Sequence, residues 1–539
     1  MKVYNGKGIS PGIAFGKAKL LQKDEHLINS VLTGNADDEW ALFLSAKEEA
    51  DGQLAVLFAE IQSRLGHDEA MIIDVQRMML LDADFDDFVK NMIYNENCTA
   101  PHAVRQAGNH FSVLFANLDD PYMKARSTDI ADVSDRLTRI LLGLSTDIHL
   151  TQPSVIIAED LTPSETLQMD KSKIRAFVIQ KGSDTSHTAI LARIMNIPCI
   201  IQCDIPLEQS LEGKEIAVDG ALGLCYFSPD KAARTMLSQK HNEETKHRET
   251  LLGMKGLPTI TSDGRTVRLY SNIGSPDDIV HVLENDSEGI GLFRSEFLYL
   301  GRNDYPSEDE QFEAYRKVAQ AMGDKQVIIR TLDIGADKQA NYFGLDAEEN
   351  PALGLRGIRI CIDRPEIFIT QLRSIYRASA FGNIAMMFPM ITSVWEVRHC
   401  KQIAQNVRDQ LILEGHEIGE VQIGIMIETP AAAMMAEEIA KEVDFFSVGT
   451  NDLTQYTLAI DRQNDKLEQF NDPHHPAIMK MLNMIAAAAS NAGISAGICG
   501  ELAADIKVTK ALIDMGFDKL SVSPVCTLTL RKLIREIGL

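Results

Sequence analysis

Residues 422–452 read QIGIMIETPAAAMMAEEIAKEVDFFSVGTND. Within this stretch a short apolar run ends in Glu-Thr-Pro, a helix-forming segment follows, and a second apolar run ends in Gly-Thr-Asn-Asp. Short apolar runs bounded by turn residues predict buried strands, and the longer segment between them predicts a helix. The stretch therefore predicts a strand–helix–strand unit of a parallel sheet.

The same alternation extends over the chain from about residue 260 onward. Eight apolar runs alternate with helical segments, and they read TVRLYSNI (266–273), GIGLFRSE (289–296), QVIIRTLD (326–333), IAMMFPMI (384–391), QIGIMIET (422–429), FFSVGTND (445–452), SAGICGEL (495–502) and KLSVSPV (519–525). Eight such units in residues 259–539 predict a (β/α)₈ barrel. An open doubly wound sheet is the alternative, but no G-x-G-x-x-G motif follows any of these runs.

Four further regions precede the barrel in the chain. Residues 1–22 carry a Gly/Pro turn and a short apolar segment, and residues 147–228 alternate β-branched runs with helical segments in an α/β pattern. Residues 23–146 carry long stretches with a 3.6-residue apolar period, which predict a helical domain. Residues 229–258 are polar and helix-prone, so we expect a connector helix there.

The bulk composition narrows the class of protein. The chain has 539 residues and a formal net charge of −24, which argues against non-specific nucleic-acid binding and favours basic partners. Residues 23–139 alone hold 22 Asp/Glu and 10 Lys/Arg, which fits either a solvated helical surface or a docking surface for a basic protein.

Signals for the membrane and for secretion are missing from the sequence. No apolar run reaches the roughly 18 residues of a membrane helix, and the start MKVYNGKGIS lacks the apolar core of a secretion signal. None of the eight cysteines forms a C-x-x-C pair. We therefore expect a cytoplasmic protein with reduced thiols and no membrane insertion.

Polar side chains collect where the predicted barrel strands end, which is where (β/α)₈ barrels hold their active sites. Guanidinium forks bind phosphate oxygens bidentately, and Mg²⁺ takes a few carboxylates and completes its shell with substrate oxygens and water. The side chains in question are Arg294, Arg330, Lys338, Glu428, Asp452 and Arg462. Together they predict a small phosphorylated acid bound through a metal ion.

A second polar group lies in residues 182–193, which read GSDTSHTAILAR. A Gly turn and Thr-Ser stand directly before an apolar-periodic helix, so Thr185 or Ser186 is expected as the N-cap. His187 then stands in the first turn, where free backbone N–H groups and the helix dipole favour an anion. The pattern fits a phosphohistidine, and the alternative is a histidine that merely caps a helix.

Motifs along essentially the whole chain occur in the order found in one known family. They are SPGIAFGKA (10–18), AEDLTPSET (158–166), TSHTAILAR (185–193), GIGLFRSEFLYL (289–300), RTLDIGADK (330–338), NPALGLRGIRI (350–360), MFPMI (387–391), IETPAA (427–432), SVGTNDLTQYTLAIDR (447–462) and GICGELAAD (497–505). In these motifs the chain resembles the Enzyme I family of the bacterial phosphoenolpyruvate:sugar phosphotransferase system.

The resemblance implies a role for each matching residue. It implies transfer of the phosphoryl group of phosphoenolpyruvate (PEP) to His187 and then to a histidine of the small phosphocarrier protein HPr, with release of pyruvate. It implies phosphate binding by Arg294, Arg330 and Arg462, further substrate contacts by Asn451, Arg356 and Lys338, Mg²⁺ ligation by Glu428 and Asp452, and protonation of the enolate carbon by Cys499.

The resemblance also implies a domain organisation and an assembly. Residues 1–22 and 147–228 would form one α/β domain that carries His187, and residues 23–146 would dock HPr. Residues 229–258 would connect this part to the PEP-binding barrel of residues 259–539. Members of the family are cytoplasmic homodimers whose two subunits associate through their barrel domains, so the resemblance implies the same assembly here. Ser183-Asp184 stand where many members have Gly-Arg, which places a negative charge near His187 in place of a positive one.

Two other functions share parts of this pattern. A pyruvate,phosphate dikinase or PEP synthase has the same phosphohistidine and barrel modules, but it also needs a nucleotide-binding domain, and no G-x-x-x-x-G-K-[ST] motif is present. A regulatory paralogue that turns over little is the alternative from another class. The intact arginine, carboxylate and cysteine positions favour a working enzyme.

Overall fold

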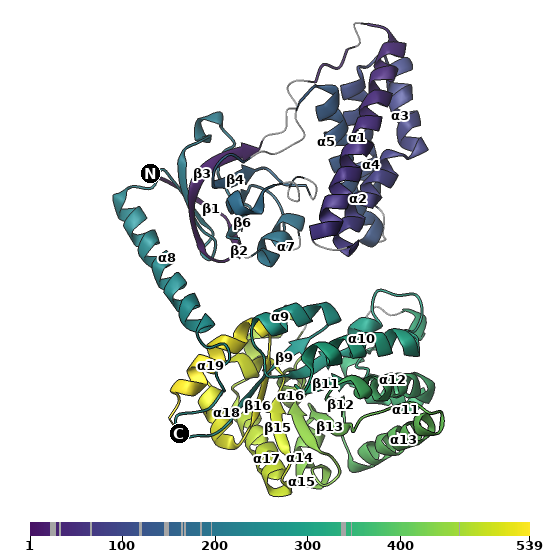
Figure 1. The fold of residues 1–539 in the computed structure, drawn as a ribbon, viewed down its shortest axis with the longest axis vertical. Coiled ribbons are helices and arrows are strands. Elements are labelled where there is room, and N and C mark those ends of the chain that lie inside the picture. Colours follow the sequence, from purple (N-terminus) through teal and green to yellow (C-terminus); the bar gives the residue numbers. More distant parts are fainter. Residues whose placement is uncertain are drawn as a thin grey trace. The chain divides into compact units, whose positions relative to one another are not determined.

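The chain divides into two compact units, residues 1–247 and 248–539 (Figure 1). The structure is a computed structural model, and it describes residues 1–21, 28–31, 34–64, 67–117, 121–144, 150–162, 165, 169–183, 186–195, 197–335, 341–346, 348–462 and 464–538.

The second unit contains a closed barrel of eight parallel strands. The strands are β9 (Arg268–Ile273), β10 (Ile290–Arg294), β11 (Val327–Arg330), β12 (Ile384–Phe388), β13 (Gln422–Ile427), β14 (Phe445–Val448), β15 (Ser495–Ile498) and β16 (Lys519–Val522). Each pairs with its neighbour in chain order, and β16 pairs with β9 to close the ring. Every strand lies within one of the eight apolar runs, so the predicted (β/α)₈ barrel is confirmed.

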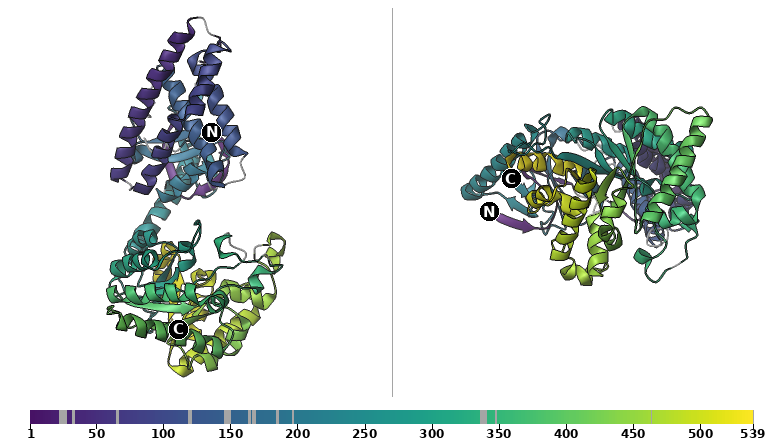
Figure 2. Two further views of the ribbon diagram at one scale, coloured as in Figure 1. Left: turned by 90° about the vertical axis from the view of Figure 1, so that its right-hand side faces the viewer. Right: turned by 90° about the horizontal axis from the view of Figure 1, so that it is seen from below.

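Helices surround the strands, as the further views in Figure 2 show. They are α9 (Ile279–Glu284), α10 (Glu308–Met322), α11 (Ile358–Asp363), α12 (Pro365–Ala378), α13 (Val394–Leu413), α14 (Pro430–Met434), α15 (Ala436–Ile439), α16 (Thr450–Leu458), α17 (Pro476–Ala492), α18 (Thr509–Met515) and α19 (Thr527–Glu536).

Side chains alternate between two apolar layers of the barrel, because successive residues of a strand face opposite sides. On β11, Val327 and Ile329 belong to the large cluster shared with the helices, whereas Ile328 belongs to a smaller cluster with Phe445 and Cys499. The smaller cluster fills the barrel interior. Gly424 on β13 leaves room for the Phe445 ring, which a Cβ there would approach to 2.4 Å.

The first unit contains a mixed eight-stranded sheet and a group of helices. The strands are β1 (Lys2–Asn5), β2 (Lys7–Ser10), β3 (Ile13–Leu21), β4 (Ser154–Ala158), β5 (Ile174–Ile179), β6 (Cys199–Ile201), β7 (Glu215–Asp219) and β8 (Leu224–Phe227), in the order β1-β8-β7-β3-β4-β5-β6-β2. Between β3 and β4 come α1 (Ala36–Arg64), α2 (His67–Leu80), α3 (Ala83–Tyr94), α4 (Ala100–Ala116) and α5 (Pro121–Leu141), with an apolar core of their own.

This arrangement confirms an α/β domain with an inserted helical domain, because β3 pairs with β4 across the insertion. The short helix α7 (His187–Ile194) packs near β2 and β6. The long polar helix α8 (Lys231–Leu252) follows β8. The domain limits given from the sequence stay predictions. Among the described residues, no helix is long and apolar enough to span a bilayer.

Candidate active site

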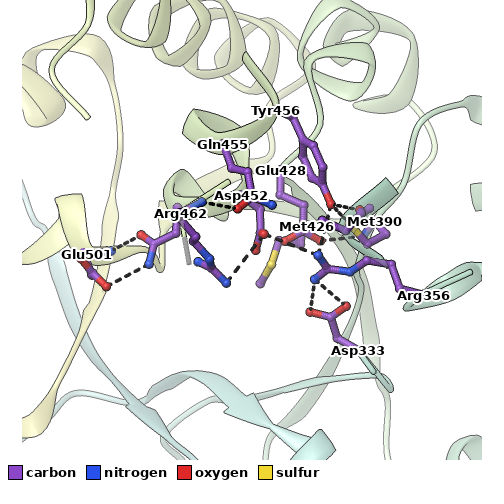
Figure 3. A network of polar contacts seen from close by, with 12 residues as sticks. Asp333, Arg356, Met390, Met426, Glu428, Asp452, Gln455, Tyr456, Arg462 and Glu501 are labelled. Carbon is purple, nitrogen blue, oxygen red and sulfur yellow. Dashed lines mark hydrogen bonds and ion pairs between the residues drawn. The ribbon is translucent and has the colours of Figure 1, made fainter. Parts of the chain in front are cut away.

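Polar side chains meet at the carboxyl ends of the barrel strands, where Figure 3 shows them as one network. Arg294 and Arg330 are the last residues of β10 and β11, and Glu428 directly follows β13. Asp452 stands in the first turn of α16, just after β14, and Cys499 directly follows β15. The parallel strands therefore bring together residues that are far apart in the sequence.

Asp333 and Glu296 hold the guanidinium group of Arg330. The Nη2 atom of Arg330 donates to Glu296 Oε1 at 2.6 Å, and its Nη1 atom lies 2.8 Å from Asp333 Oδ2. Asp333 also accepts from Arg356 Nη2, at 3.2 Å to Oδ1 and 3.3 Å to Oδ2. All four side chains are buried. The Nε atom of Arg330 is buried as well and has no hydrogen-bond partner in the part of the chain that the structure describes.

The surrounding carboxylates keep both buried arginines charged. Burial alone would lower the pKa of Arg330 and of Arg356, but the carboxylates outweigh it, with Asp333 the strongest in each case. The pKa of each guanidinium is therefore raised above its ordinary value. Two charged guanidinium groups are therefore held in fixed positions at the carboxyl ends of the strands, and such groups bind anionic oxygens well.

Glu428 is fully buried and only half satisfied. Its Oε1 atom accepts from the backbone N–H of Met390 at 2.6 Å, and its Oε2 atom has no hydrogen-bond partner among the described residues. Met390 has a φ of 55°, an uncommon value for a residue with a side chain. Burial, together with repulsion from Asp333 and Asp452, raises the pKa of Glu428 to about 8.

Asp452 lies between two arginines, as Figure 3 shows. Its Oδ1 atom is 3.6 Å from Arg356 Nη1 and 3.8 Å from Arg462 Nη2, and it accepts no hydrogen bond from any described residue. Two buried carboxylate oxygens, one each on Glu428 and Asp452, are thus available to a hard cation. This donor set fits Mg²⁺, because Mg²⁺ binds through one or two carboxylates together with substrate phosphate and water.

The remaining predicted substrate residues line the rim of the site. Arg294 and Arg462 are exposed, and the backbone N–H of Arg462 donates to Gln455 Oε1 at 3.1 Å. Asn451 exchanges two bonds with Glu501: its Nδ2 donates to Glu501 Oε1 at 3.1 Å, and its Oδ1 accepts from the Glu501 backbone N–H at 3.0 Å. The orientation of the Asn451 amide is therefore fixed by this pair.

Cys499 is buried next to the arginine cluster. Its backbone N–H donates to Val448 O at 3.0 Å, and its Sγ lies 3.4 Å from the same oxygen. Burial is the main reason that the pKa of the thiol is raised to about 11, although Ser447 and Arg330 oppose the shift. At neutral pH the thiol therefore carries a proton.

His187 is the first residue of α7, in the unit of residues 1–247. Ser186 Oγ accepts from the Ala189 backbone N–H at 3.4 Å, so Ser186 occupies the N-cap position. Thr185, the other cap candidate, and Lys338 lie outside the described residues. The structure thus places the backbone of His187 at a helix start and brings the barrel residues, apart from Lys338, to one rim.

Three residues of the network had no role assigned from the sequence. Glu296 and Asp333 each stand within three residues of an arginine that was assigned one, and both occur in quoted motifs. Tyr456 follows Asp452 by four residues, which places the two on one face of α16. The short sequence distance of Glu296, Asp333 and Tyr456 from predicted site residues was therefore the signal that could have indicated a role for them.

Comparison with known proteins covers the whole chain. Models described as PEP-utilising enzyme match it in three parts: the N-terminal model over residues 5–126, the mobile-domain model over residues 150–223 and the PEP-binding-domain model over residues 248–539.

Full-length relatives agree with these matches. A phosphoenolpyruvate-protein phosphotransferase of Staphylococcus carnosus is 38% identical over 544 residues, which cover 100% of this chain and 94% of the relative. Proteins of the same name from Priestia megaterium and Bacillus subtilis are 39% identical over 540 residues and 37% identical over 541 residues. These two alignments also cover 100% of this chain, with 94% and 95% of the respective relatives.

Proposed function

The chain belongs to the phosphoenolpyruvate-protein phosphotransferases of the PEP-utilising enzyme family, and from this premise we propose that it transfers the phosphoryl group of PEP to His187. His187 would then pass the group to a histidine of an HPr-type carrier protein. The observation that carries the proposal is a set of buried polar atoms in the barrel site that have no hydrogen-bond partner among the described residues. In the described structure, a buried guanidinium N–H and two buried carboxylate oxygens have no hydrogen-bond partner there, and this combination of donor and acceptors fits a phosphate anion bound together with a cation.

The arginines would bind the phosphate group of PEP. Arg330 is held from behind by Glu296 and Asp333, which leaves its Nε–H for a substrate oxygen. Arg294 and Arg462 would close around the phosphate from the rim, with Asn451, Arg356 and Lys338 as further contacts. Charge spreads over the equatorial oxygens in a loose phosphoryl transfer, so fixed guanidinium groups help most in the transition state.

Glu428 and Asp452 would hold Mg²⁺. When bound, the ion supplies positive charge to the phosphate and carboxylate oxygens of PEP. Glu428 Oε2 and Asp452 Oδ1, which accept no hydrogen bond in the described structure, would bind the ion, and Arg356 and Arg462 flank Asp452 Oδ1 at 3.6 and 3.8 Å.

The covalent steps balance without any further reactant. The bond between phosphorus and the enol oxygen of PEP breaks, and a bond forms between phosphorus and a ring nitrogen of His187. The enolate left behind takes a proton on its methylene carbon from the Cys499 thiol, which gives pyruvate. The thiolate then recovers a proton from water.

The helical insertion would dock the carrier protein. Its excess of acidic residues, 22 Asp/Glu against 10 Lys/Arg in residues 23–139, is complementary to a basic partner. Assembly as a cytoplasmic homodimer through the barrel completes the proposal.

Pyruvate release tests this function. With PEP, Mg²⁺ and a trace of enzyme, we expect sustained release only when the carrier protein is present, because each enzyme molecule otherwise stops once it is phosphorylated. Release that ignores the carrier would contradict the proposal.

The metal ligands are tested in the same assay. Glu428→Gln and Asp452→Asn should each require far more Mg²⁺ or lose activity. Glu396→Gln is a matched control, since Glu396 is a buried carboxylate that caps α13 and accepts from the backbone N–H groups of Thr392 and Ser393. A wild-type Mg²⁺ dependence in either site variant would show that the residue is not a ligand.

A further inference from the structure

Tyr456 joins two parts of the barrel rim that carry proposed substrate residues. It lies on α16, the helix that begins with Thr450, Asn451 and Asp452. Its hydroxyl accepts a hydrogen bond from Arg356 Nη1 at 3.1 Å and donates to the backbone oxygen of Ala352. Figure 3 shows the ring reaching down from α16 to Arg356. A single hydroxyl group therefore links α16 to the segment that bears Arg356.

Arg356 depends on this hydroxyl for part of its position. Its Nη2 is held by both oxygens of Asp333, but its Nη1 has only the Tyr456 hydroxyl within hydrogen-bond distance in the described structure. Asp452 Oδ1 lies farther from Nη1, at 3.6 Å. Without the hydroxyl, the guanidinium could turn toward Asp452 and occupy a carboxylate oxygen that the metal site needs.

The backbone around Arg356 is tied down by the same contact. Ala352 lies in the short turn Pro351–Leu353, which precedes Arg356 by only a few residues. Other ties of this segment come from closer in the sequence: Arg359 Nη1 donates to Leu353 O and Gly354 O, and the backbone N–H of Gly357 donates to Ile334 O at 3.0 Å. The bond from Tyr456 to Ala352 spans 104 residues and reaches the segment from the helix that follows β14, on the same rim of the barrel.

We propose that Tyr456 is a positioning residue for the reaction, acting through Arg356. The hydroxyl keeps the guanidinium directed at the substrate and away from Asp452, and it fixes the Pro351–Leu353 turn beside the site. This inference rests on the proposed function, since it assigns Tyr456 to the same PEP site.

Removal of the hydroxyl alone tests the inference. Tyr456→Phe keeps the ring, which packs partly buried against the barrel core. Losing a hydrogen bond to a charged group should lower kcat/KM for PEP about tenfold or more. Tyr342→Phe is the matched control, because Tyr342 also donates its hydroxyl to a backbone oxygen, Tyr299 O at 2.5 Å, and among the described residues it makes no hydrogen bond to Arg356, Asp333 or Asp452. It should keep the wild-type kcat/KM.

A double-mutant cycle separates positioning from mere structural support. In an Arg356→Met background, Tyr456→Phe should cause no further loss, because the group through which it acts is gone. If Arg356→Met turns over too slowly, the Kd of PEP with Mg²⁺, measured by calorimetry on the same four proteins, follows the same logic.

Each outcome decides the matter. A Tyr456→Phe enzyme equal to Tyr342→Phe would overturn the inference, and so would an equal loss in both Arg356 backgrounds. A wild-type chain that takes no phosphoryl group from PEP would overturn the proposed function instead, and the two failures are thereby distinguishable.

Discussion

At the scale of single residues, Asp333 organises the site although it is not expected to touch the substrate. It accepts from both Arg330 and Arg356, and it raises the pKa of Glu428. One buried carboxylate thus keeps two cations fixed and makes a bound cation beside Glu428 favourable. The role of Asp333 depends on contacts made only in the folded protein. The sequence therefore predicted the two arginines as substrate residues but not the carboxylate that holds them.

Arg330→Lys should lower kcat by about 10²-fold or more, the scale for losing one preorganised donor. A lysine retains the charge, but its three N–H groups share one nitrogen. It therefore lacks the planar fork by which Arg330 reaches Glu296 and Asp333 through two separate nitrogens while its Nε–H remains for the phosphate. Steady-state kinetics with PEP as the varied substrate measure this. A change confined to KM would point to binding in the ground state and against the transition-state role.

Cys499→Ala should leave phosphorylation of His187 possible while slowing the formation of pyruvate. Because the pKa of the thiol is about 11, the thiol stays protonated between about pH 7 and 9, and the rate of proton donation should not change over that range. In deuterated water, the variant should also lose the stereochemical preference of proton addition to the methylene carbon. If that preference is unchanged, Cys499 serves only as packing in the barrel interior.

At the scale of elements, the cap of α10 gives a measurable pH dependence. Ser307 and Glu310 form a reciprocal capping box at its start. The hydrogen bond from the backbone N–H of Ser307 is the main cause that lowers the pKa of Glu310 from 4.5 to about 2, and the hydrogen bond from Arg302 is the next. A carboxyl group whose pKa is lowered by folding stabilises the fold at pH values above its pKa in the unfolded chain. That stabilisation is lost as the pH falls toward its pKa in the folded protein.

Glu310→Gln should therefore lower the Tm at neutral pH, and its difference from the wild type should shrink between about pH 4.5 and 2. Calorimetry across this range measures the difference. A Tm difference that stays constant down to pH 2 would show that the carboxylate charge makes no contribution.

The elements themselves could be predicted from sequence, whereas their connections could not. Each barrel strand is a short apolar run that ends in polar residues, so its type and its functional end follow from local pattern. The hydrogen bond from the Tyr456 hydroxyl to Ala352 O could not be predicted from a local pattern, since the two residues are 104 positions apart. The same holds for the Met390 backbone, whose positive φ lets its N–H reach Glu428.

At the scale of the whole molecule, the proposed transfer requires a moving domain. His187 lies in residues 1–247, and the site that would bind PEP lies in residues 248–539. In-line transfer needs the attacking nitrogen about 3–3.5 Å from phosphorus. The same nitrogen must later meet a histidine of a docked carrier protein, so we expect the α/β domain to move between two positions, with a hinge in residues 229–256. The sequence also placed hinges near residues 23 and 146, which lie outside the described residues.

An engineered disulfide between the α/β domain and the helical insertion should abolish phosphorylation by PEP. It should preserve phosphorylation by an already phosphorylated carrier protein. Reduction of the disulfide provides the control, because it should restore the reaction with PEP. A tethered enzyme that still reacts with PEP at the normal rate would rule out the swivelling motion.

The identity of the phosphoryl acceptor is the central claim. The most direct measurement is mass spectrometry of the intact chain after incubation with PEP and Mg²⁺, followed by mapping of the modified residue at neutral pH. We predict one phosphoryl group, located on His187, and none on a His187→Ala variant that still binds PEP. A phosphoryl group on another side chain, or normal transfer by His187→Ala, would contradict the account.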